Sequence, residues 1–89
     1  MTSRTTERFR KSFSKLPANV QDQANRAFAL WRRNPTHPSL QFKRIHATDP
    51  IYAVRIGIHW RALAVVRDDR AVWFWIGHHS EYDNLISQW

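Results

Sequence analysis

The sequence contains no cysteine, and Gly57 and Gly77 are its only two glycines among 89 residues. The absence of cysteine excludes disulfides, thiolate nucleophiles and cysteine-ligated zinc. Two isolated glycines cannot form a glycine-rich phosphate loop. No apolar run approaches the about 20 residues that span a membrane, and residues 1–15 are too polar for a signal peptide. We therefore expect one cytoplasmic domain over residues 1–89, with no membrane partner.

Acidic residues are also scarce, because 7 Asp and Glu stand against 14 Lys and Arg, a formal net charge of +7. Most of the excess precedes Thr36, where eight basic residues face only Glu7 and Asp22. A small basic domain favours a polyanionic partner, such as nucleic acid, the ribosome or an acidic protein. Charge alone does not distinguish these partners.

The most informative stretch is the apolar run Val72–Ile76, which ends at Gly77 and is followed at once by the polar segment HHSEYD, residues 78–83. About five β-branched and aromatic residues closed by a glycine predict a strand buried on both faces, and therefore a central one. Polar groups at the end of such a rigid element are positioned accurately. The segment after Gly77 is thus the first candidate for a functional site.

The first half of the chain predicts two amphipathic helices. Apolar residues from Phe9 to Leu16 recur at spacings of four and three, as on one face of a helix. A second apolar stripe with helical spacing runs from Val20 to Trp31, and Pro17 is suited to start that helix. Two such helices must pack on an apolar surface, which the strands that follow can supply.

The second half predicts an antiparallel meander with strands over 40–45, 52–56, 60–66 and 72–76, joined by short turns. Ser80 is expected to cap a last short helix over 81–88, with Asp83 in a capping-box-like position. Residues 1–6 carry no periodic signal, which leaves a frayed terminus or a short edge strand open. The predicted fold class is α+β, with two N-terminal helices packed on a four-stranded antiparallel sheet and a short C-terminal helix.

Three side chains are candidates for catalysis. Arg55 and Arg61 pair directly if the connection at Gly57 is a three-residue loop with a bulge, whereas a two-residue loop would place Arg55 opposite Trp60. His79, after the next strand, can approach them. Two guanidiniums beside an imidazole suit a phosphodiester, because arginine binds phosphate oxygens and histidine exchanges protons near neutral pH. The same residues could also be solvated sheet positions and a strand-end histidine bonded to a carbonyl.

Other polar residues are weaker candidates. Lys43 and Arg44 could contact RNA phosphates or merely lie on the surface, and Tyr82 could pack on the sheet or stack on a base. The five histidines show no recognised metal-ligand spacing, and no serine lies in a nucleophile elbow. We therefore expect no metal, no cofactor and no nucleophilic triad.

Three segments carry a family resemblance: LPANVQDQANRAFALWRRNPTHPSLQFKRI, YAVRIGIHWRALAVV and VWFWIGHHSEYDNLI. They resemble the RelE/ParE superfamily of toxins from bacterial type II toxin–antitoxin systems, over about residues 9–86. The resemblance implies a small toxin held inactive by a cognate antitoxin. RelE-like members cleave mRNA in the ribosomal A site and so block translation as metal-independent endoribonucleases, or mRNA interferases. ParE-like members instead inhibit DNA gyrase and lack the nuclease residues.

The resemblance also assigns roles. The basic residue late in the first hairpin strand of RelE-like members falls on Arg55, their arginine early in the next strand on Arg61, and their basic or histidine residue after Ile-Gly on His79. Tyr82 and Asp83 occupy the neighbourhood of a further aromatic or acidic group.

The sequence departs from the family pattern at three places. A second lysine of some members falls near Ala53, and the position six after His79 is Leu85 rather than a tyrosine. The family usually has a strand before the helices, for which residues 3–6 are a poor candidate.

Overall fold

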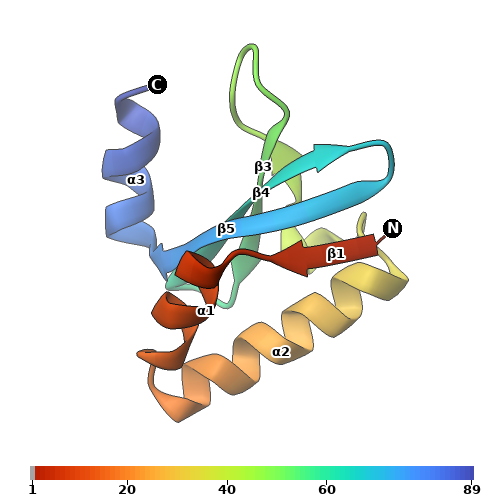
Figure 1. Cartoon of the computed structure of the whole chain (residues 1–89). Coiled ribbons are helices and arrows are strands. Elements are labelled where there is room, and N and C mark those ends of the chain that lie inside the picture. The colour runs from red at the N-terminus through yellow and green to blue at the C-terminus, as the bar shows by residue number, and fades with distance from the viewer. Residues whose placement is uncertain (1) are drawn as a thin grey trace.

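A five-stranded mixed sheet forms the centre of the molecule in the computed structural model, which describes residues 2–89. Its strand order is β1-β5-β4-β3-β2, and helices α1 and α2 lie on one face while α3 follows the end of β5 (Figure 1). The strands are β1 (Thr2–Thr5), β2 (Lys43–Arg44), β3 (Ile51–Ile56), β4 (Trp60–Arg67) and β5 (Arg70–His78). The helices are α1 (Glu7–Ser14), α2 (Ala18–Arg33), a short 3-10 turn η1 (Pro38–Leu40) and α3 (His79–Ser87).

The predicted sheet of four antiparallel strands was wrong at one edge, where β1 pairs in parallel with β5. The short edge strand is thus the correct one of the two interpretations left open for the N-terminus. All four side chains of β1 are exposed, so the strand shows no apolar alternation and is held through its main chain. Directly after it, Thr6 accepts a hydrogen bond from the amide of Phe9 at 3.1 Å and caps α1.

The predicted helical hairpin is confirmed, and Pro17 precedes the first residue of α2. The stripes of both helices pack on the sheet in one core. Trp31 of α2 contacts Trp73 of β5 edge to face, with ring centroids 5.3 Å apart. Other buried members of this core are Phe9, Ala24, Leu40, Val54, Ile56, Ala62, Ala64, Ala71 and Ile76.

The β5 strand is central, as predicted, because it lies between β1 and β4. It continues through Gly77 to His78, and Val72 is 39% exposed, so burial on both faces does not hold along its whole length. Opposite β4, Trp73 pairs with Ala64 and Trp75 pairs with Leu63, which leaves Phe74 as an extra bulged residue. Phe74 and Trp75 therefore both pack in a second, smaller core with Ala53, Leu63, Tyr82, Leu85 and Ile86.

Two predicted elements differ in detail. Of the strand expected over 40–45, only Lys43–Arg44 is extended, because η1 precedes it and Gln41 adopts a left-handed conformation with φ of 44°. The helix α3 begins at His79, and its cap is the side chain of His78, whose Nδ1 accepts a hydrogen bond from the amide of Ser80 at 3.2 Å. Within residues 2–89, no helix has the length and apolar character needed to cross a membrane.

Candidate active site

A cavity of about 200 Å³ lies where β3 and β4 meet the first turns of α3. Five of the six candidate site residues line it: two come from the β3–β4 hairpin, two from α3 and one from β2. The lining residues are Gln41, Lys43, Ala53, Val54, Arg55, Arg61, His79, Tyr82 and Asp83. A larger cavity of about 600 Å³ between β1, α1 and α2 is lined by two arginines and seven uncharged side chains, with no histidine or carboxylate, so we place the chemistry in the smaller one.

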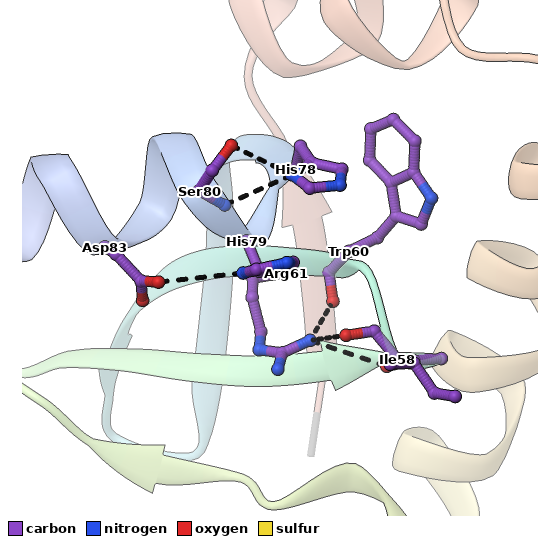
Figure 2. Close-up of polar contacts among 8 residues, drawn as sticks. Ile58, Trp60, Arg61, His78, His79, Ser80 and Asp83 are labelled. Carbon is purple, nitrogen blue, oxygen red and sulfur yellow. Dashed lines mark hydrogen bonds and ion pairs between the residues drawn. The ribbon is translucent and has the colours of Figure 1, made fainter.

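The hairpin brings the two arginines together. Its connection is the three-residue loop Gly57 to His59, and Arg55 pairs with Arg61 in the ladder, as expected for that loop length. The Nε of Arg55 donates to the carbonyl oxygen of Gly57 at 3.1 Å. The Nη1 of Arg61 donates to the carbonyl oxygens of Trp60 at 2.8 Å, of Ile58 at 3.3 Å and of Gly57 at 3.4 Å (Figure 2).

The electrostatics of the pair favour an anion. Burial lowers the pKa of the Arg61 guanidinium below its usual value, and the positive charge of Arg55 lowers it further, while Tyr82 and Asp83 act in the opposite direction. Arg61 still carries its charge at neutral pH, because arginine titrates far above it. The mutual repulsion of the two arginines is relieved when a negative group lies between them.

His79 is placed by the end of β5 and the start of α3. Its amide donates to the carbonyl oxygen of His59 at 2.7 Å, which fixes the first residue of the helix against the hairpin loop. Its ring nitrogen Nδ1 lies 3.6 Å from Oδ2 of Asp83, one helical turn later (Figure 2). A carboxylate on Nδ1 orients the imidazole and leaves Nε2 as the nitrogen for exchange with a ligand.

Tyr82 lies on the cavity wall and in the second core at once. It is 8% exposed, and its ring packs against Trp75 with centroids 6.5 Å apart, which favours packing over stacking on a base. Burial raises the pKa of its hydroxyl, the charge of Arg61 opposes that effect, and Asp83 adds to it. Tyr82 is therefore a neutral phenol at neutral pH.

The two basic residues of β2, Lys43 and Arg44, have different surroundings. Lys43 lines the cavity, whereas Arg44 donates to the carbonyl oxygens of His46 at 3.2 Å and Thr48 at 2.8 Å in the next loop. Neighbouring residues of a strand face opposite sides of the sheet, so only one of the pair can reach the site. Sequence reasoning missed Gln41, which enters the cavity wall because of its left-handed backbone; no residue pattern indicated that turn.

Residues 18–84 match the family model of a ParE-like toxin domain. The chain belongs to the ParE-like toxin family. This match confirms the RelE/ParE superfamily that the sequence resemblance predicted. No curated protein matches its sequence.

Solved structures of similar fold are also toxins or toxin–antitoxin complexes. The RelB–RelE complex from Methanococcus jannaschii superposes with a TM-score of 0.72 at 15% sequence identity, and the match covers 91% of this chain and 95% of the chain in that complex. The RelBE2 complex from Mycobacterium tuberculosis gives 0.70 at 23% identity, over 86% and 95%. The isolated RelE toxin from Escherichia coli gives 0.68 at 17% identity, over 96% and 97%. At these identities the likeness establishes a RelE-like fold.

Proposed function

We propose that this protein is a ribosome-dependent mRNA endonuclease that cleaves without a metal and thereby blocks translation. The observation that carries this proposal is the gathering of Arg55, Arg61 and His79 around one small cavity. In such cleavage the ribose 2′-hydroxyl attacks the adjacent phosphorus and the 5′-oxygen leaves. The reaction needs a base, an acid and cations on the phosphate.

The arginine pair is suited to the phosphate. Its guanidiniums share the carbonyl oxygen of Gly57, so they are held near each other before any substrate binds. Arginine presents a planar fork of donors to phosphate oxygens. We assign to Arg55 and Arg61 the stabilisation of the negative charge that builds up on the phosphorane-like transition state.

His79 is the proton-transfer group in this proposal. With Nδ1 facing Asp83, its Nε2 is available to take a proton from the 2′-hydroxyl or to give one to the leaving 5′-oxygen. Asp83 acts through His79 as a positioning residue.

The remaining candidates take binding roles. Lys43 adds a third positive charge to the cavity, and the phenol of Tyr82 is a neutral donor on its wall. Arg44 is committed to two loop carbonyls, so we expect its contribution to RNA binding to be the smallest.

The test is cleavage of mRNA on purified translating ribosomes, mapped by primer extension. Wild-type protein should cut, and both Arg61→Ala and His79→Ala should lose most of the activity. Arg67→Ala is the matched control, because Arg67 is an exposed arginine of β4 next to the β4–β5 turn and pairs with Arg70 there. An uncut message with wild-type protein, or undiminished cutting by a His79→Ala/Arg61→Ala double variant, would refute the proposal.

The description of the matched family favours a second candidate, a ParE-like toxin that inhibits DNA gyrase without nuclease activity. That function predicts gyrase-dependent DNA cleavage complexes and a DNA damage response while mRNA stays intact. Plasmid supercoiling by purified gyrase, with and without the toxin, separates the two. Inhibition that survives Arg61→Ala and His79→Ala would favour gyrase as the target.

The partners follow from the same proposal. Four of the similar structures are complexes of a toxin with its antitoxin. We propose that a cognate antitoxin likewise neutralises this toxin in the cytoplasm, where ribosomes and mRNA are present. Growth arrest on expression of the toxin alone, relieved by co-expression of the neighbouring small reading frame, tests this. Harmless expression without any partner would contradict it.

A further inference from the structure

We propose that His59, His78 and His79 form a binding site for a divalent transition-metal ion such as Zn²⁺ or Cu²⁺. One ring nitrogen from each of the three residues lies within 4.8 Å of the others. The rings come from two places in the chain: His59 from the hairpin loop, and the other two from the junction of β5 and α3. Imidazole is a common ligand of both ions.

The three rings form a compact group at the surface. Their centroids are 4.5 Å apart for His78 and His79, 5.9 Å for His59 and His78, and 6.1 Å for His59 and His79. The main chain holds the group together, because the amide of His79 donates to the carbonyl of His59 at 2.7 Å. His59 is exposed and the other two are half-buried, so an ion can reach the group from solvent.

Nitrogens bound to one tetrahedral zinc ion lie about 3.4 Å apart, since each Zn–N bond is about 2.0–2.1 Å. The three ring nitrogens lie within 4.8 Å of one another, so rotation of the side chains must bring them together by up to about 1.4 Å. Three imidazoles and one water complete a tetrahedral zinc site.

The polar contacts around the rings indicate which nitrogens would bind the ion. Nδ1 of His79 faces Asp83 at 3.6 Å, the carboxylate–histidine arrangement that supports metal-bound imidazoles, so Nε2 is left for the ion. Nδ1 of His78 lies 3.0 Å from Oγ of Ser80 and 3.2 Å from the Ser80 amide. With a metal on Nε2, Nδ1 carries the proton and donates to the hydroxyl instead of accepting from the amide (Figure 2). Binding through Nε2 therefore removes the side-chain acceptor that caps the Ser80 amide at the start of α3.

The site has a consequence for the cavity that rests on the proposed function. An ion on Nε2 of His79 removes the nitrogen that exchanges the proton, so a metal would inhibit cleavage reversibly. The binding of the ion itself does not depend on any nuclease activity.

The experiment is calorimetric titration of tag-free protein with Zn²⁺, without RNA or ribosomes. We expect one ion per chain and an affinity at least tenfold lower in His59→Ala. This substitution is the mildest one available, because the hydrogen bond from His79 goes to the main chain of His59. The matched control is a His37→Ala/His46→Ala double variant, which removes the two histidines outside the cluster and should bind Zn²⁺ as wild type does.

The electron paramagnetic resonance spectrum of bound Cu²⁺ gives a second readout, because nitrogen splitting from three imidazoles should weaken in His59→Ala. Circular dichroism checks that the variants fold. Equal affinity and equal spectra in wild type and His59→Ala would overturn the site, as would loss of binding in the double variant.

In the ribosome assay, His59→Ala should cleave mRNA as wild type does, and Zn²⁺ should not inhibit this cleavage. Zinc binding without any mRNA cleavage by wild type would refute only the proposed nuclease function. Cleavage without zinc binding would refute only the metal site.

Discussion

Arg55 and Arg61 donate to the same acceptor, the carbonyl oxygen of Gly57, from Nε at 3.1 Å and from Nη1 at 3.4 Å respectively. The two cationic side chains are therefore held close together before an anionic ligand binds. The arrangement depends on the three-residue loop, because this loop length places the two arginines opposite each other in the ladder. Preorganised donors of this kind need no rearrangement as charge develops.

The planar donor geometry of the Arg61 guanidinium should matter more for cleavage than its positive charge alone. Arg61→Ala is expected to lower the single-turnover rate of mRNA cleavage by about 100-fold or more, the usual effect of losing a donor to a developing oxyanion. Arg61→Lys keeps a charge but loses the planar fork, so it should recover only a small part of the rate. Full activity in the lysine variant would show that a point charge suffices.

The loop conformation should be sensitive at Gly57. Its φ of 62° lies in the left-handed region, where Gly57→Ala is expected to destabilise the fold by about 1–2 kcal/mol. A Cβ atom there would also lie 2.9 Å from Oε1 of Gln23, the far end of a flexible side chain that can move. Urea unfolding measures the change. Gly57→Asn should cost less, because asparagine tolerates the left-handed region better; equal losses would point to the contact rather than the backbone.

Tyr82 should titrate above its usual value of about 10. Burial is the main cause of the raised pKa, as described for the cavity wall. In a Tyr52→Phe variant, Tyr82 is the remaining tyrosine, and its ionisation can be followed by absorbance at 295 nm. A midpoint at or below pH 10 would contradict the buried position of the ring.

The raised pKa of Tyr82 also predicts how the stability of the fold depends on pH. The folded protein holds the Tyr82 proton more tightly than the unfolded chain does, because the folded pKa is raised. This contribution to the free energy of unfolding is therefore complete below about pH 10 and is lost as the pH rises through the folded pKa. Tyr82→Phe should reduce the loss between pH 9 and pH 11 relative to wild type, measured by urea unfolding at each pH.

Asp83 should act through the orientation of His79. His79→Ala is expected to lower cleavage by about 100-fold or more, as for a lost acid–base group. Asp83→Asn should lower it by less, since the imidazole remains. Nitrogen NMR of the His79 ring should show a smaller fraction of the tautomer with the proton on Nδ1 in Asp83→Asn. An unchanged tautomer together with reduced cleavage would assign Asp83 a different role.

Much of the site could be predicted from the sequence because it depends on local patterns. Clean alternation in 52–56, a single glycine in the connection and a run of aromatic residues before Gly77 place Arg55, Arg61 and His79 at one end of a meander. The sequence also favoured packing of Tyr82 on the sheet over stacking on a base, and its ring is buried in the structure.

The remainder depends on contacts that leave no pattern in the sequence. The β1 strand consists of exposed polar residues whose main chain alone pairs with β5. The histidine cluster arises only when the hairpin loop that carries His59 is folded onto the start of α3. Likewise, the positive φ of Gln41 is set by η1 rather than by any preference of glutamine.

The bulge at Phe74 changes which face of the sheet the later side chains of β5 occupy. With the extra residue, Trp73 and Ile76 both point to the helical core although they are three positions apart, an odd spacing that a regular strand would place on opposite faces. If the same sequence formed a regular strand without the bulge, every side chain beyond Phe74 would turn to the other face. Because α3 continues directly from β5, the orientation of His79 relative to the arginines is set five residues earlier, by one inserted residue in the strand.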